Sequence, residues 1–358
     1  MRPRIHRTGS LPRPASRGMS IVELLVAIGI GMLIVAAMAI LFANNSRSRS
    51  DTERASRKIE NGRYAVEVLR GELYHAGYLA EFDPAGLAAT LPTTMPDPCA
   101  TDVASLRAAL GIHIQGYDNI ATTTLSCLPD VKAGTDAIAI RRASGCAVGS
   151  SGCTALPAGA PAFQASSCHS AMELGSGIVT TKFKLDTDTT ALTLTKRNCT
   201  TVADTRRYLV RIYYVANNDK PGDGIPTLKY TELGAGSFSA TSLVQGVENL
   251  QVEYGLDTNA NGDADVYTAD PNLYLACNAG SAPTCVGHWV SVVSAKVFLL
   301  SRNVEAVAGY TDNKQYILGR KADGNPNEYT SLEAGYKRQV FQEVVRLQNP
   351  SGRRGSPS

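Results

Sequence analysis

The stretch from Asp257 to Asp265 carries oxygen-bearing side chains at the spacing of a cation-binding loop. It reads Asp-Thr-Asn-Ala-Asn-Gly-Asp-Ala-Asp, and Gly262 permits a sharp turn. Ca²⁺ takes about six to eight oxygen ligands, so a loop of this kind can wrap the ion. The expected ligands are the side chains of Asp257, Asn259, Asn261 and Asp265 and the backbone carbonyl of Asp263. The sequence therefore predicts calcium as a candidate ion and no other cofactor.

The end of this loop departs from the EF-hand pattern. Its twelfth position is Thr268 and not a bidentate glutamate, although Asp270 could substitute. The segment before the loop also has the pattern of a strand and not of a helix. The alternative is a polar hairpin loop in which Asn261-Gly262 forms a tight turn.

A single carboxylate, Glu23, stands at the beginning of an apolar stretch. Leu24–Ala43 contains twenty residues without a charge, and as a helix it spans about 30 Å, the thickness of the hydrocarbon core. A charge within a membrane segment is costly and usually functional. The alternative is a first-turn acid that the helix dipole favours and that reaches the interface.

The positive charge of the chain is concentrated ahead of this stretch. Residues 1–18 contain five arginines and no acid; without them the chain has 30 basic and 32 acidic residues, a net charge of −2. A nucleic-acid-binding domain needs a basic surface, so no nucleic acid is expected as a partner.

The leader, Gly18, Glu23 and the apolar stretch together resemble the class III signal of type IV prepilins and pseudopilins. The resemblance implies that a prepilin peptidase removes residues 1–18 by cutting between Gly18 and Met19, and then methylates Met19. It also implies that Glu23 pairs with the N-terminal amine of a neighbouring subunit during assembly. Met19 departs from the family, which usually has phenylalanine there.

Segments of the second half resemble the PilW branch of minor pilins. They are residues 207–210, 246–255, 257–265 and 337–341, whereas residues 81–200 match no pattern that we can name. The resemblance implies a minor pilin that primes a type IV pilus, or enters it in low copy, for twitching motility or adhesion. Its partners would be other minor pilins and the major pilin, through the N-terminal helix.

The resemblance also implies a location. The chain would span the inner membrane once, with its head in the periplasm, before it enters the filament. Arginines on both sides of the apolar stretch leave the orientation open by charge alone, and the cysteines favour an exported head. Two alternatives stay open: a minor pseudopilin of a type II secretion system, and a membrane-anchored periplasmic enzyme or ligand-binding protein that retains residues 1–18.

All eight cysteines follow the apolar stretch, which predicts disulfides in an oxidising compartment. They are Cys99, Cys127, Cys146, Cys153, Cys168, Cys199, Cys277 and Cys285. A zinc site is disfavoured because there is no C-x-x-C pair and histidine is scarce. The nearest pairs, Cys146–Cys153 and Cys277–Cys285, close short loops and are expected first.

The sequence lacks the short motifs of common enzyme classes. It contains no G-x-x-x-x-G-K, G-x-G-x-x-G, G-x-S-x-G or H-E-x-x-H pattern. Cys168 and His169 are adjacent, but adjacency in sequence is poor evidence for a nucleophile and its base. We therefore do not expect this chain to be an enzyme.

The surrounding elements indicate an α+β fold, a long N-terminal helix packed on an antiparallel β-sheet head. The helix is expected over residues 19–76, a membrane-spanning half followed by an amphipathic half, with Gly77 as its stop. The apolar stripe of the second half is Ile59, Val66, Leu69 and Leu73. The alternative is two helices broken near Asn44-Asn45.

The head is expected over residues 77–348. Residues 81–200 hold six cysteines and many small residues, which predicts a loop-rich part with short strands, such as 136–140, pinned by disulfides. Residues 201–348 are expected to be β-rich. The strands expected there cover residues 207–215, 250–254, 289–300 and 337–347. Residues 349–358 have no apolar content, which predicts a disordered tail.

Overall fold

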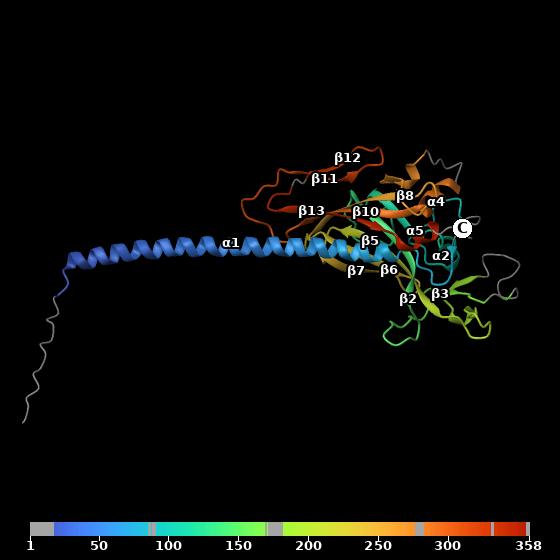
Figure 1. Ribbon diagram of the computed structural model, residues 1–358. Helices are drawn as coiled ribbons and strands as arrows, with labels where there is room; N and C mark the ends of the chain where they lie inside the picture. Colours follow the sequence, from blue (N-terminus) through green and yellow to red (C-terminus); the bar gives the residue numbers. More distant parts are fainter. Residues whose placement is uncertain are drawn as a thin grey trace, which may run out of the picture. The chain divides into compact units, whose positions relative to one another are not determined.

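The structure is a computed structural model. It describes residues 18–84, 87, 91–168, 170, 182–275, 283–330 and 333–355 (Figure 1). The chain divides into two compact units, Met1–Glu53 and Arg54–Ser358.

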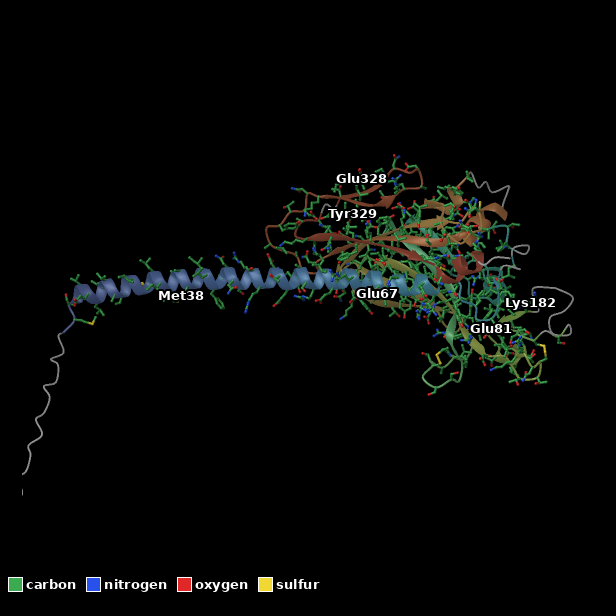
Figure 2. All side chains as sticks on the ribbon, viewed as in Figure 1. Met38, Glu67, Glu81, Lys182, Glu328 and Tyr329 are labelled. Carbon is green, nitrogen blue, oxygen red and sulfur yellow. A yellow bond between two sulfur atoms is a disulfide. The ribbon has the colours of Figure 1, made fainter. Side chains whose placement is uncertain are left out.

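The first described element is α1, Ile21–His75, a single helix of 55 residues. It runs without a break through Asn44 and Asn45, so the alternative of two helices is wrong. Its most apolar stretch of 18 residues has a mean hydropathy of 2.9, and none of this stretch is buried. By length and composition, α1 is therefore long and apolar enough to cross a membrane. Met38 is one of the exposed side chains of this stretch (Figure 2).

The second half of α1 belongs to the second unit and buries one face. Leu69 and Leu73 of the predicted stripe are fully buried, together with Ala65. Gly62 is buried as well, and a Cβ at this position would collide with the ring of Phe341. The helix ends at His75, and Gly77 follows with a φ of +70°, a left-handed conformation that glycine adopts at little cost.

The larger sheet has seven strands, and every pairing within it is antiparallel. The strands are β1 (Ile114–Ile120), β2 (Thr135–Ala147), β3 (Ala162–Ala165), β4 (Phe183–Asp186), β5 (Thr205–Ala216), β6 (Thr227–Leu233) and β7 (Phe238–Gln245). β5 is central, because it pairs with β2, β3 and β6. β7 extends the sheet beyond β6, and β4 extends it beyond β3.

The second sheet has the order β13-β10-β8-β9, and it is also antiparallel. Its strands are β8 (Val247–Leu256), β9 (Val266–Thr268), β10 (Val292–Arg302) and β13 (Arg338–Arg346). A separate hairpin joins β11 (Gln315–Arg320) to β12 (Pro326–Thr330). Within the described residues, the short helical segments with given bounds are α2 (Val103–Ala108), η3 (Thr189–Ala191), η4 (Pro271–Leu273), α4 (Pro283–Val290) and α5 (Gln348–Arg354).

The main core lies where α1 and the two sheets meet. One cluster joins Leu69 of α1, Ile140 of β2, Tyr213 of β5 and Leu250 of β8, and it includes the fully buried Trp289. The predicted fold class, a long apolar N-terminal helix with an antiparallel α+β head, is therefore confirmed.

Two local expectations were wrong. Residues 349–355 are not disordered: α5 covers most of them, and Ser351 is fully buried. Polar contacts hold α5, because Ser351 donates to the carbonyl of Gly262 over 2.5 Å. The strand expected from Trp289 begins instead at Val292, since Trp289 lies in α4 and donates through Nε1 to Asn272.

Candidate functional site

The predicted cleavage site lies in an exposed segment just before α1. Residues 18–20 have no regular secondary structure, and Met19 is 68% exposed. The amide of Ser20 donates to Glu23 over 3.0 Å, and the amide of Val22 donates to the Ser20 hydroxyl over 3.3 Å. These bonds form a capping box, in which a serine and a glutamate satisfy the free amides of a helix start. Glu23 therefore has a local role as a first-turn acid; its pairing with another subunit stays a prediction.

The loop from Asp257 to Asp265 is closed by its own hydrogen bonds. The buried carboxylate of Asp257 accepts from the amides of Asn261, over 3.2 Å, and Gly262, over 2.9 Å. It also lies 3.5 Å from Nη1 of Arg354 on α5. A cation that used this carboxylate would therefore compete with a guanidinium.

The other carboxylates of the loop differ in exposure and partners. Asp265 accepts from the amide and hydroxyl of Thr258 and from Asn259, and these hydrogen bonds lower the pKa of its carboxyl. Asp263 is exposed and lies 3.4 Å from Arg346. In the described part of the chain, no group of three or more histidine, cysteine, aspartate or glutamate side chains is arranged to hold a metal ion. The calcium site stays a prediction.

Sequence reasoning missed the contact between this loop and α5. Arg354 donates to the carbonyl of Asp257 over 3.3 Å and to the hydroxyl of Ser291 over 3.0 Å. Gly262 has a φ of +87°, and a Cβ there would lie 2.6 Å from the carbonyl oxygen of Ser351. The adjacent Arg353 and Arg354 were the available signal for this contact, because a guanidinium group has five N–H donors that can bind backbone carbonyls.

Three disulfides lie within the described residues: Cys99–Cys127, Cys146–Cys153 and Cys168–Cys199. Cys146–Cys153 is one of the two local pairs suggested by the sequence. Cys285 is also disulfide-bonded, whereas Cys277, its expected partner, lies outside the described residues. The other two bridges span 28 and 31 positions, and sequence spacing does not reveal such pairings.

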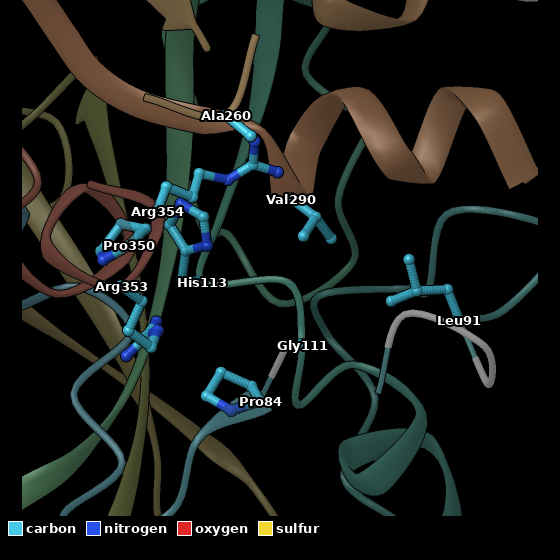
Figure 3. A pocket seen from close by; sticks show the side chains of 9 residues that line it. All are labelled: Pro84, Leu91, Gly111, His113, Ala260, Val290, Pro350, Arg353 and Arg354. Carbon is cyan, nitrogen blue, oxygen red and sulfur yellow. The ribbon is translucent and has the colours of Figure 1, made fainter. Parts of the chain in front are cut away.

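A pocket of about 250 Å³ opens beside α5. Figure 3 shows His113, Arg353 and Arg354 on one side of it and Leu91 on the other. His113 donates through Nε2 to the carbonyl of Val292 over 2.7 Å, and its burial lowers the imidazole pKa to about 3. The lining described here includes no carboxylate and no thiol. It therefore offers a neutral imidazole and two guanidinium groups between apolar walls, without a nucleophile and base pair.

A second buried polar group lies between the two sheets. Asp136 of β2 accepts from the amide of Asn119 over 2.9 Å and from the amide of Val252 in β8 over 2.8 Å. Burial raises the pKa of Asp136 well above its usual value, and burial together with the nearby Asp270 raises the pKa of Asp118. The side chain of Asp136 therefore links β1 of the larger sheet to β8 of the second sheet, which is a structural role.

The fold and the N-terminal segment together define a class of protein: one helix that is apolar enough to span a membrane, followed by an antiparallel α+β head. The family model described as type IV pilus-assembly protein W matches residues 212–349, which run from β5 to α5. The match covers less than half of the chain and relates it to type IV pilus assembly. No curated protein and no solved structure shows a significant match.

Proposed function

We propose that the chain is a minor pilin that primes a type IV pilus or enters it in low copy. One observation carries the proposal: a chain that matches the pilus-assembly family over residues 212–349 also begins with a membrane-length helix. The class III signal resemblance of Gly18, Met19 and Glu23 supports it. The proposal assigns the chain no catalytic role.

The physical logic is that one helix serves two apolar environments. Before assembly, the exposed apolar side chains of residues 24–43 are stable in the bilayer, with the head in the periplasm. After assembly, the same side chains pack against the helices of neighbouring subunits, including other minor pilins and the major pilin. The disulfides of the head suit an oxidising compartment.

Processing by prepilin peptidase is the first step of the proposed pathway. The segment at residues 18–20 is exposed and lacks regular structure, as a protease substrate must be at its scissile bond. Intact mass and N-terminal sequencing of protein from native membranes should give a chain that begins at N-methylated Met19. A chain that still begins at Met1 would contradict the proposal.

Deletion of the gene in the native organism tests the function itself. Surface pili and twitching should be lost or reduced, protein secretion should be unchanged, and a plasmid copy should restore both losses. Loss of secretion with normal pili would favour a pseudopilin of a type II secretion system. Normal pili and normal secretion would favour a membrane-anchored protein outside both systems.

A further inference from the structure

We propose that a groove between α1 and the segment after β10 binds a phosphate group, either free or carried by a lipid headgroup. The groove has a volume of about 290 Å³ and lies within the second compact unit. Arg54, Arg57, Lys58 and Asn61 line it from α1, and Arg302 and Glu305 line it from the other side. This site is independent of the proposed pilin function.

The α1 wall presents three cations on one helical face. Arg57 and Lys58 follow Arg54 by three and four positions. At this spacing, each of them lies one helical turn from Arg54 on the same side of α1. Only Glu305 opposes them within the groove lining: its carboxylate lies 3.2 Å from Nε of Arg54 and 3.5 Å from Nη1 of Arg57. Arg57 shares this carboxylate with Arg54 and is 61% exposed, so part of its guanidinium stays available to an anion.

Lys58 contributes a half-buried ammonium group. Among the described residues, its ammonium makes no hydrogen bond or ion pair; only its backbone carbonyl accepts, from Ser301. Burial lowers the pKa of Lys58, Lys314 and Lys337 lower it further, and Asp312 acts in the opposite direction. An anion bound in the groove would give this ammonium a close ion-pair partner.

Arg302 supplies a buried donor to the same groove. The residue is 4% exposed, and its guanidinium stacks on Tyr336 with the ring centroid at 3.7 Å. Nη1 pairs with Glu333, and Nη2 donates to the carbonyl of Gly224 over 3.0 Å. Nε is buried and has no acceptor within the protein. A buried donor without an acceptor is costly, and a ligand oxygen would satisfy it.

The chemistry of these groups favours phosphate over a single carboxylate. Phosphate carries about −1.5 to −2 charges as a monoester, with three strong acceptor oxygens. Guanidinium groups bind such oxygens bidentately, and a lysine adds a compact charge. Arg302 is already paired with Glu333 and lies 3.9 Å from Glu248, so the groove does not need a full neutralising charge there. A phosphate instead offers several acceptor oxygens at once, for Lys58, for Arg57 and for Nε of Arg302, which a single carboxylate does not.

The test uses the full chain in a neutral detergent, with inorganic phosphate titrated at constant ionic strength by isothermal calorimetry. Lys58→Gln and Arg57→Gln should each weaken binding about tenfold, because each removes one charge-assisted contact. Arg63→Gln is the matched control, since Arg63 is an exposed arginine on α1 outside the groove. Melting temperatures of the variants should equal that of the unmodified chain.

Amine-selective labelling of Lys58, read by mass spectrometry, distinguishes the two sources of phosphate. Protection in phosphatidic acid nanodiscs, whose headgroup is a phosphate monoester, but not in phosphatidylcholine nanodiscs, would assign the groove to a lipid headgroup. Protection only after inorganic phosphate is added would assign it to a soluble phosphate. Unchanged labelling under both conditions, or equal weakening by Arg63→Gln and Lys58→Gln, would overturn the proposal.

Discussion

Glu248 of β8 and Arg338 of β13 form a buried bidentate ion pair, although they are 90 positions apart in the chain. Nε of Arg338 lies 2.5 Å from Oε2 of Glu248, and Nη2 lies 3.0 Å from Oε1. Nη1 also lies 3.1 Å from Asp312, and all three side chains are at most 1% exposed. Both strands pair with β10, so the ion pair ties the two neighbours of that strand together.

The first prediction concerns this pair. Arg338→Met should lower the free energy of unfolding by about 3–5 kcal/mol, because it leaves the buried carboxylate of Asp312 without its ion-pair partner and leaves Glu248 only Arg302, 3.9 Å away. Chemical denaturation of the full chain in detergent measures the change. Arg70→Met is the control: it breaks the exposed Arg70–Glu67 pair, which water screens, and should leave stability nearly unchanged. Similar losses in both variants would contradict the assigned role.

The ion pair also shows how far the sequence could be interpreted. The segments around Glu248 and Arg338 are separate motifs in the sequence, and the strands predicted there correspond to β8 and β13. Their contact depends on the register of each strand against β10, which one sequence does not reveal.

Contacts of small and polar residues account for the other features that we did not predict from the sequence. Periodicity located Leu69 and Leu73 on the buried face of α1, but it gave no signal for Gly62, because glycine carries no hydrophobic side chain. α5 was missed because contacts of Ser351 and Arg354 with the distant loop around Gly262 hold it in place. In the candidate site, the spacing of Asp257 and Asp265 was visible, whereas the nearby guanidinium of Arg354 was not.

The second prediction compares two glycines of α1. Alanine normally stabilises a helix over glycine by about 1 kcal/mol. Gly71→Ala should show this gain, since a Cβ there meets nothing within 4 Å. Gly62→Ala should instead cost about 1–3 kcal/mol, because its Cβ collides with the ring of Phe341. Denaturation curves of the two variants should therefore move in opposite directions; stabilisation by Gly62→Ala would show that Phe341 moves aside easily.

The third prediction is a loss of stability in acid caused by His113. Burial, with Arg353, Arg354 and Arg141 nearby, lowers the pKa of His113 to about 3, whereas an unfolded histidine titrates near its ordinary value of 6.5. Below that value the unfolded chain binds one proton more than the folded chain, so stability falls as the pH falls from 6.5 towards 3. The slope should approach about 1.4 kcal/mol per pH unit.

His113→Gln isolates this contribution, since its amide can still donate to the carbonyl of Val292 but does not titrate. The raised pKa of Asp136 acts with the opposite sign, because the folded chain then holds the extra proton and loses stability as the pH rises. Both chains contain Asp136, so its effect cancels when the free energy of unfolding of His113→Gln is subtracted from that of the original chain at each pH. A difference that is independent of pH would contradict the prediction.

The fourth prediction separates two roles of Glu23. If its charge pairs with an amine in the filament, Glu23→Ala and Glu23→Gln should both insert in the membrane but be depleted from sheared pili. Losing one partner of a buried pair costs about 3–5 kcal/mol. Glutamine keeps an acceptor for the Ser20 amide, so it preserves the cap and removes only the charge. Normal incorporation of Glu23→Gln, with depletion of Glu23→Ala, would assign the residue to helix capping alone.

The last prediction tests calcium at the loop from Asp257 to Asp265. An ion that binds only the folded chain adds about 1.4 kcal/mol of stability at ten times its dissociation constant. The affinity should be in the range of about 10⁻⁴ to 10⁻³ M, typical of extracellular modules. The melting temperature of the full chain in detergent should therefore rise with millimolar calcium and fall back with chelator.

Two variants make this test specific to the loop. Arg354→Gln should increase the calcium shift, because it removes the guanidinium that lies 3.5 Å from the carboxylate of Asp257. The double variant Asp257→Ala, Asp265→Ala should abolish the shift, although it also removes the hydrogen bonds that close the loop and should melt lower without calcium. A melting temperature that does not change with calcium, or a shift in the double variant equal to that of the original chain, would rule out calcium binding at this loop. The hydrogen bonds that backbone amides donate to Asp257 and Asp265 would then be the whole reason for the acidic spacing, as in a polar hairpin loop.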